Sequence, residues 1–78
     1  MNKHYVISNR SRTTTPAQWI EVNGVELQYQ ASGETVWCHD GYEWVQADFV
    51  SEDDARRVAL EINGANPARM MTFEVVEA

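Results

Sequence analysis

Alternating apolar and polar positions predict β-strands over much of the chain. Residues 19–22 and 25–29 alternate on either side of Asn23-Gly24, a pair typical of the type I′ turn that joins two antiparallel strands. A shorter β-branched and aromatic run at residues 4–7 predicts an earlier strand. We therefore expect one strand followed by a tight hairpin.

The same pattern recurs and predicts a second hairpin. Residues 35–39 and 42–49 are rich in aromatic and β-branched side chains, and they flank an Asp-Gly pair at residues 40–41. If this pair is the whole turn, Trp37 lies directly opposite Trp44 on the neighbouring strand.

The pattern then changes to a helical period. Ser51 is suited to cap a helix that begins with three carboxylates at residues 52–54, which the helix dipole favours. The apolar positions recur every three or four residues on one helix face. They are Ala55, Val58, Ala59 and Ile62. Asn63-Gly64 and then Pro67 predict the end of this helix, and residues 70–77 predict a last strand.

These elements predict an α+β fold. The order β-ββ-ββ-α-β is typical of a single, mostly antiparallel sheet that one helix covers on one face. The chain of 78 residues has room for one small domain, residues 1–78. Its content of 44% apolar and 23% charged residues is that of a folded chain and not of a disordered one.

The strand alternation assigns side chains to the two faces of the predicted sheet. The face expected to meet the helix is apolar and carries Ile20, Val22, Val25, Leu27, Tyr29, Val36, Cys38, Val45, Ala47 and Phe49. The opposite face mixes large aromatic side chains with carboxylates and carries Trp19, Glu21, Glu26, Gln28, Gln30, Thr35, Trp37, His39, Tyr42, Trp44, Gln46 and Asp48.

Charge is distributed unevenly along the chain. Residues 1–12 contain Lys3, Arg10 and Arg12 and no acid, whereas residues 13–55 contain nine acids and no Lys or Arg, within a net charge of −6. Such an acidic stretch repels phosphates and attracts basic surfaces, so direct binding to nucleic acid is disfavoured. The acids could equally serve only to keep a small protein soluble.

The aromatic and acidic face has two interpretations. As a protein-binding surface it would use aromatic anchors and steering carboxylates, with Trp37, Trp44 and Tyr42 at its centre. The further candidate residues are Trp19, Glu21, Glu26, Asp40 and Asp48. Alternatively, the aromatic side chains form a cross-strand cluster that stabilises a thin sheet.

No motif in the sequence predicts catalysis, a cofactor or a metal. Cys38 and His39 are adjacent on a strand and therefore point to opposite faces, so that His39 cannot activate the thiol. Cys38 is expected to be a buried, unreactive apolar residue. Two histidines without spaced partners do not form a metal-ligand motif. We expect a non-enzymatic protein.

The single cysteine and the short apolar run near the N-terminus predict neither a disulfide framework nor a signal peptide. We therefore expect a cytoplasmic location.

The chain opens with Tyr5-Val6-Ile7, continues through turn-rich hairpins to the segment at residues 49–57, and ends on a strand that includes residues 71–76. In length, charge and element order it resembles the small acidic proteins that phages and other mobile elements encode, among them anti-CRISPR and anti-restriction inhibitors. The resemblance implies an inhibitor that occupies the nucleic-acid groove of a host defence protein, with its carboxylates where phosphates would lie. No site residue is transferred, because such inhibitors share no common pattern.

Three functions remain open at this point. The first is an acidic inhibitor or adaptor that binds a basic, nucleic-acid-handling protein. The second is single-strand nucleic-acid binding, with the exposed aromatics as stacking platforms and the basic N-terminal residues holding phosphates. The third is a self-associating module that forms a homodimer through the aromatic face or a strand edge.

Overall fold

The computed structural model describes residues 3–65 and 73–78. Within them the chain forms one antiparallel sheet of six strands and one helix, which confirms the predicted α+β fold. The elements are β1 (Tyr5–Asn9), β2 (Gln18–Val22), β3 (Val25–Ser32), β4 (Thr35–His39), β5 (Trp44–Gln46), α1 (Glu52–Ala65) and β6 (Phe73–Glu77). The helix continues through Asn63-Gly64 to Ala65, so the predicted stop at this pair is wrong. The predicted stop at Pro67 and the predicted strand residues 70–72 lie outside the described residues.

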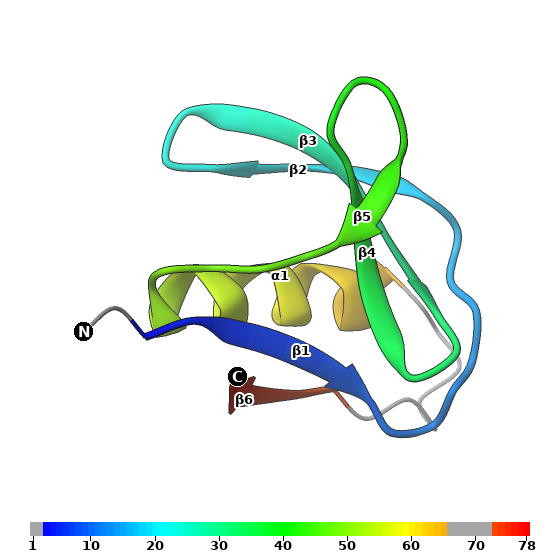
Figure 1. Ribbon diagram of the computed structural model, residues 1–78. Coiled ribbons are helices and arrows are strands. Elements are labelled where there is room, and N and C mark those ends of the chain that lie inside the picture. The colour runs from blue at the N-terminus through cyan, green and yellow to red at the C-terminus, as the bar shows by residue number, and fades with distance from the viewer. Residues whose placement is uncertain (1–2, 66–72) are drawn as a thin grey trace.

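The strands follow the order β2-β3-β4-β1-β6, and β5 pairs with β4 beside this path. One edge of β4 is shared between two partners, because Thr35 pairs with β1 while residues 37–39 pair with β5. After β5 the chain crosses to β1, where Tyr5 and Phe49 exchange backbone hydrogen bonds of 2.8 and 2.9 Å. β4 is therefore the branch point of the sheet, which curves around the helix rather than being flat (Figure 1).

The helix packs inside this curved sheet. Figure 1 shows α1 between the β2–β3 hairpin and the β1–β6 pair, and α1 contacts all four of these strands. Its predicted apolar face is buried, since Ala55, Val58, Ala59 and Ile62 are at most 8% exposed. They pack with the buried side chains of the sheet, which include Ile7, Ile20, Tyr29, Ala31, Val36 and Phe49. We call this side of the sheet the inner face and the opposite side the outer face.

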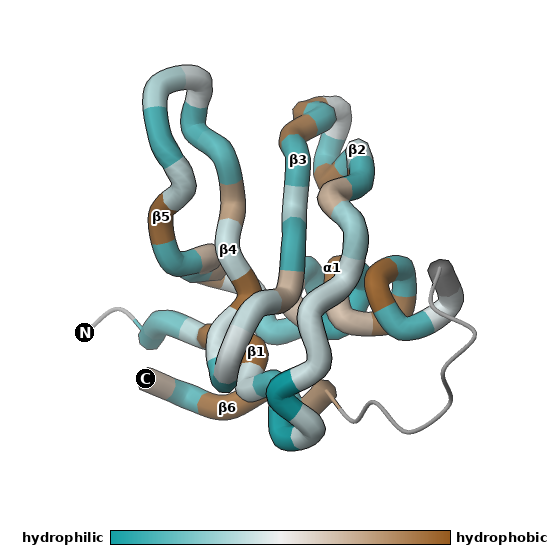
Figure 2. The backbone as a smooth tube through the Cα atoms, turned by 90° about the vertical axis from the view of Figure 1, so that its right-hand side faces the viewer, coloured by the Kyte–Doolittle hydropathy of each residue, from teal (hydrophilic) through white to brown (hydrophobic). Residues whose placement is uncertain are grey.

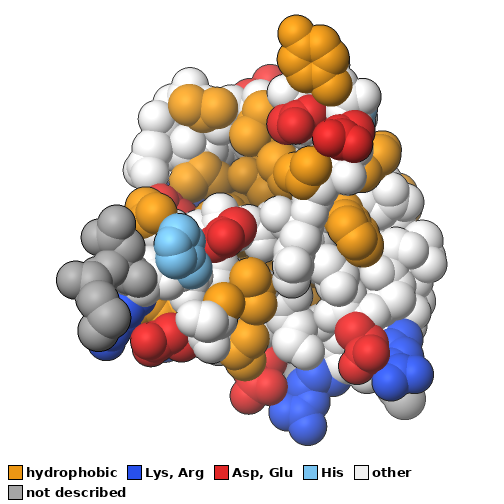
Figure 3. Space-filling view, in the orientation of Figure 1, with side chains coloured by type: hydrophobic (Ala, Val, Ile, Leu, Met, Phe, Trp, Pro, Cys, Tyr) orange, Lys and Arg blue, Asp and Glu red, His pale blue; other side chains and the backbone are white. Residues whose placement is uncertain are grey.

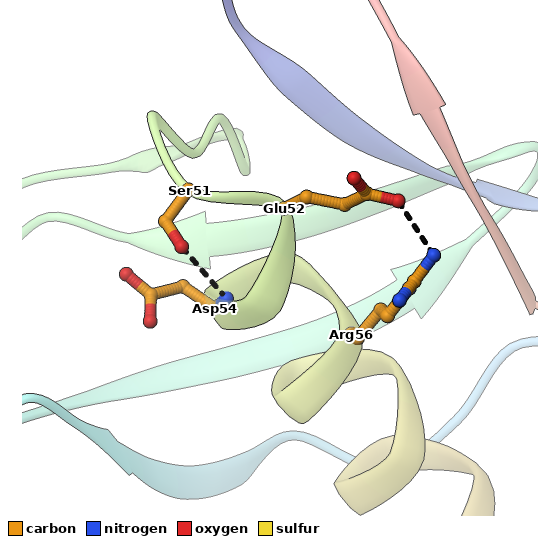
Figure 4. Close-up of polar contacts among 4 residues, drawn as sticks. All are labelled: Ser51, Glu52, Asp54 and Arg56. Atoms are coloured by element: carbon orange, nitrogen blue, oxygen red, sulfur yellow. Dashed lines mark hydrogen bonds and ion pairs between the residues drawn. The ribbon is translucent and has the colours of Figure 1, made fainter.

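The start of the helix forms as the sequence predicts. The Ser51 hydroxyl accepts a hydrogen bond from the Asp54 backbone N–H at 3.4 Å, and Arg56 forms an ion pair with Glu52 at 2.6 Å (Figure 4). The cap satisfies a backbone donor in the first turn, and the carboxylates there complement the helix dipole. Among the described residues, no helix is long and apolar enough to cross a membrane.

The first hairpin has the predicted register. Glu21 lies opposite Glu26, and Asn23 and Gly24 both have positive φ angles, of 53° and 82°. These are the values that a type I′ turn requires. Local turn chemistry is therefore sufficient to set this register.

The predicted register of the second hairpin is wrong by two residues. Trp44 lies opposite His39 and not opposite Trp37, which instead faces Gln46. The loop spans four residues because the Asp40 carboxylate accepts hydrogen bonds from the backbone N–H groups of Tyr42 and Glu43, at 2.8 and 3.0 Å. Such a side-chain turn competes with a two-residue hairpin turn. A shift of two residues leaves each side chain of the strand on its predicted face.

Figure 1 shows the first hairpin running alongside α1, whereas the β4–β5 loop points away from the helix, and Figure 2 shows both hairpins on the same side of α1. The helix contacts mainly β1, β2, β3 and β6, so it covers only part of the inner face. Val25, predicted to meet the helix, lies near the tip of the first hairpin and is 57% exposed. The prediction for Val25 is wrong because this part of the inner face lies against the segment between β5 and α1 and not against the helix. Val25 lines an open hollow there with Ala47 and Phe49.

Candidate protein-binding surface

Four side chains form a continuous row across four strands of the outer face. Trp19 pairs with Gln28, Gln28 with His39, and His39 with Trp44. Directly paired residues project from the same face of an antiparallel sheet, so the four side chains lie side by side. We call Trp19, Gln28, His39 and Trp44 the tryptophan row. Trp19 is 61% exposed and Trp44 is 37% exposed, so both ends of the row present indole surface.

The His39 ring is fixed between two partners. Its centroid lies 5.2 Å from that of Trp44 with an interplanar angle of 83°, which is the edge-to-face arrangement that aromatic rings prefer. Its Nδ1 atom accepts a hydrogen bond from the Gly41 backbone N–H at 3.1 Å. Neutral His39 therefore carries its proton on Nε2. The same hydrogen bond connects the β4–β5 loop to the tryptophan row.

A second row lies next to the first. Gln30 pairs with Trp37, and Trp37 pairs with Gln46. Trp37 is half-buried, and its indole N–H donates to the Ser32 carbonyl at 3.2 Å. Gln30, Ser32, Trp37 and Trp44 together line an open depression of about 300 Å³. Trp37 and Trp44 therefore share this depression as diagonal neighbours rather than as a direct pair.

Carboxylates flank the tryptophan row at the tip of the first hairpin. Glu21 and Glu26 are directly opposed and exposed, as predicted. The Glu21 carboxylate accepts a hydrogen bond from the Gly24 backbone N–H at 2.7 Å, while its own backbone carbonyl accepts one from Arg57 Nε at 2.9 Å. These contacts hold the edge strand and the turn in place. Glu21 therefore stabilises the hairpin in addition to contributing negative charge to the surface.

The β4–β5 loop adds further acidic and aromatic surface. Tyr42 is 94% exposed and lies in this loop, not on a strand as the two-residue turn predicted. The backbone N–H groups of Glu43 and Tyr42 hydrogen-bond the Asp40 carboxylate and lower its pKa, so it is ionised at neutral pH. The loop thus presents a fixed negative charge beside a fully accessible phenol ring.

Asp48 does not belong to this surface, so its predicted place on the outer face is wrong. It lines a hollow with inner-face residues such as Val22 and Val25, and its carboxylate contacts His4 Nδ1 at 3.2 Å. The alternation fails at Asp48 because β5 ends at Gln46 and the chain then crosses to β1.

Cys38 lies on the predicted inner face, opposite Val45. It is half-buried and not fully buried as the sequence predicted, because the hollow leaves part of it open, but burial still raises the pKa of its thiol. Among the residues that the structure describes, no three His, Cys, Asp or Glu side chains are grouped to hold a metal ion. Gln28 and His39 complete the tryptophan row although neither was a candidate site residue. The register of the second hairpin was the signal that could have identified them.

Comparison of the chain with protein-family models, with curated proteins and with solved structures gives no match.

Proposed function

We propose that this chain is a non-enzymatic, acidic protein that binds the basic surface of a nucleic-acid-handling protein and inhibits it. The observation that carries the proposal is the tryptophan row beside the opposed pair Glu21 and Glu26. Exposed indoles provide large contact area at little cost in side-chain entropy, and neighbouring carboxylates attract a basic partner. The net charge of −6 supports the same partner class.

The resemblance to phage-encoded inhibitors supports a narrower form of the proposal. In that form the partner is a CRISPR or restriction component in the cytoplasm of a host cell, and the carboxylates of the outer face occupy positions of nucleic-acid phosphates. The exposed Asp40 and Glu43 in the β4–β5 loop extend the acidic surface beyond the tryptophan row. An extended line of negative charge is what a nucleic-acid groove attracts.

Direct binding of single-stranded nucleic acid is less well supported. Arg10 forms an ion pair with Glu74 at 3.1 Å, and Arg12 forms one with Glu34 at 3.4 Å. Two of the cations that would hold phosphates therefore already face carboxylates. Stacking on the exposed indoles would have to act against the acidic surroundings.

The proposal is tested by measuring the DNA binding of candidate partners in the presence of this chain. A CRISPR effector complex and a restriction enzyme are each titrated with the chain, and the bound fraction of a labelled DNA duplex is followed by fluorescence anisotropy. We expect the chain to displace DNA from one of them, and a double variant with Trp19→Ala and Trp44→Ala to do so much less effectively.

The control variant is Leu60→Ala, which removes an exposed apolar side chain from the solvent side of α1 and should inhibit like the original chain. Displacement that is equally strong with the double tryptophan variant would refute the role of the row. Binding of the labelled DNA by the chain itself would favour the nucleic-acid alternative. Elution as a dimer, lost in the double variant, would favour the self-associating module.

A further inference from the structure

The inner face carries an apolar hollow that the helix does not cover. It has a volume of about 230 Å³, and its walls come from the first hairpin, from β4 and from the segment that joins β5 to α1. Its apolar lining includes Val22, Val25, Leu27, Tyr29, Cys38 and Phe49. Figure 3 shows hydrophobic side chains gathered in this part of the molecule, with carboxylates beside them. We name these residues the apolar hollow.

The hollow lies between the first hairpin and the segment that joins β5 to α1, and no residue of the helix lines it. Val25 is 57% exposed, and Leu27 and Cys38 are half-buried although they belong to the apolar face of the sheet. Exposed apolar surface in a concave setting is typical of an interaction site, because its burial removes that surface from water.

The surroundings of the hollow are acidic. Asp48 lines it with a carboxylate that is about half exposed, and no Lys or Arg is among the lining residues. Asp54 lies at the turn of the same hairpin, where its carboxylate accepts a hydrogen bond from the Asn23 side chain at 2.9 Å. Burial is the main cause of the raised pKa values of Tyr29 and Cys38 in the hollow, and the charges of Asp54 and Asp40, respectively, add to it. The hollow therefore favours an apolar group that carries positive charge beside it.

The size of the hollow restricts the occupant further. Small-molecule pockets have volumes of roughly 300–1,000 Å³, so a hollow of about 230 Å³ is small for a cofactor or a drug-sized ligand. It suits a single side chain of a partner protein. Single apolar anchors surrounded by complementary charge are a common way for one protein to hold another.

From this geometry we infer a second protein-binding site, in which the apolar hollow receives an aliphatic side chain flanked by Lys or Arg on a partner protein. This site lies on the opposite side of the sheet from the tryptophan row. It goes beyond the proposed function and does not depend on it.

The test uses three capped pentapeptides and the full chain, observed by two-dimensional NMR of the backbone amides. The peptides are Gly-Lys-Leu-Lys-Gly, Gly-Glu-Leu-Glu-Gly and Gly-Lys-Gly-Lys-Gly. We expect the first peptide to shift the amide signals of Val25, Leu27 and Cys38 in a saturable manner. The acidic peptide should bind at least about threefold more weakly because of Asp48 and its neighbours, and the peptide without leucine should give no saturable shift there.

Two variants and a control locate the effect. Val25→Ser removes exposed apolar surface and Asp48→Asn removes the charge at the rim, and each should weaken binding of the Lys-Leu-Lys peptide. Leu60→Ser changes an equally apolar side chain on the helix surface and should leave binding unchanged. The variant lacking both Trp19 and Trp44 indoles should also bind the peptide normally, which separates this site from the proposed function.

Several results would overturn the inference. Equal binding of the acidic and basic peptides would indicate a neutral apolar site, and loss of binding in the double tryptophan variant would place the peptide on the outer face. Amide shifts at the hollow that depend on protein concentration without peptide would show that a second copy of the chain is the occupant. The absence of any saturable shift at the hollow would reject the site.

Discussion

Trp44 on β5 lies directly opposite His39 on β4, with the two rings edge to face and their centroids 5.2 Å apart. This contact links the short strand β5 to the tryptophan row. The Nδ1 atom of the same His39 ring accepts a hydrogen bond from the Gly41 backbone N–H, which holds the β4–β5 loop to the row as well. Trp44 therefore takes part both in holding β5 and in presenting the outer face. Trp19, at the other end of the row, is 61% exposed and can be compared with it.

This difference predicts that the two tryptophans have separable effects on stability and binding. Trp44→Ala should lower the free energy of unfolding by about 1–2 kcal/mol, since it removes an aromatic pair and partly buried surface. Trp19→Ala should change it by less than about 0.5 kcal/mol, as is usual for exposed positions. Urea denaturation of both variants provides the measurement.

Both tryptophan variants should weaken binding to a partner of the outer face, by about 2 kcal/mol or more if the indole is an anchor. Complete unfolding of Trp44→Ala would instead show that this indole belongs to the stabilising cluster, and Trp19→Ala would then carry the binding test alone.

The opposed acids at the hairpin tip lead to a second prediction. Glu26→Lys replaces a like-charge pair with an opposite-charge pair, so the free energy of unfolding should rise by about 0.2–1 kcal/mol. Glu21→Lys should raise the free energy of unfolding by less, or lower it, because this substitution also removes the hydrogen bond from the Gly24 backbone N–H. Thermal melts of the two variants make the comparison.

The same Glu26→Lys variant should associate more slowly with a basic partner, because steering by the outer face is weakened. Glu61→Lys, an equal charge change on the helix surface, is the control. If the two variants associate at the same rate, net charge rather than the acidic surface sets the rate, and the acids serve solubility.

The sequence was sufficient where a single local signal determines the structure. The type I′ turn at Asn23-Gly24 fixes the register of the first hairpin, and the periodicity of the helix identifies its buried side chains. The faces of β4 and β5 were also correct, since a register shift of two residues preserves alternation.

The sequence was not sufficient where two local signals compete or where distant segments meet. The Asp40 side chain binds the backbone of the next residues and lengthens the turn that Asp-Gly alone predicts, so Trp44 lies opposite His39. Asp48 leaves the outer face because the chain crosses to pair with Tyr5, which is far away in the sequence. Alternation within one strand cannot reveal such a crossing, and it also cannot reveal that the helix leaves the apolar hollow uncovered.

A buried asparagine, which the sequence pattern did not single out, gives a third prediction. Asn9 is fully buried; its side-chain N–H groups donate to the carbonyls of Thr13 and Gly33, both at 2.9 Å, and its Oδ1 accepts from the Ser11 hydroxyl. Asn9→Ala should lower the free energy of unfolding by about 2–4 kcal/mol, because it leaves carbonyl groups without partners.

Ser11→Ala is the matched control for Asn9→Ala, since it removes only the hydrogen bond from the Ser11 hydroxyl to Asn9 Oδ1. It should lower the free energy of unfolding by about 1 kcal/mol. Urea denaturation compares the two variants. Equal losses would show that water replaces the asparagine at little cost, and that the loop after β1 does not depend on it.

Cys38 gives a fourth prediction, because burial raises the pKa of its thiol. Only the thiolate reacts with alkylating reagents, so native Cys38 should react more slowly near neutral pH than the same cysteine in the urea-unfolded chain. The measurement is the rate of iodoacetamide labelling followed by mass spectrometry. Labelling at the same rate in both states would show that the hollow leaves the thiol open and unperturbed.

The last prediction concerns alkaline pH and Tyr29. Burial, and then the neighbouring Cys38 and Asp54, raise the pKa of Tyr29 from its ordinary value of 10.0 to about 12. The folded state therefore holds the phenol proton more tightly than the unfolded state does. Stabilisation from this group is complete below its unfolded pKa and is lost as the pH rises through the folded pKa.

We accordingly expect the free energy of unfolding to fall as the pH rises from about 10 to about 12. The measurement is a series of urea denaturations across this window, together with the ultraviolet absorbance of tyrosinate. Tyr29→Phe keeps the ring, including its stacking with Phe49 at a centroid distance of 6.2 Å, and removes the ionisable group. The variant should lose much less stability across the window, and an unchanged pH dependence would show that another group, such as Cys38, is responsible.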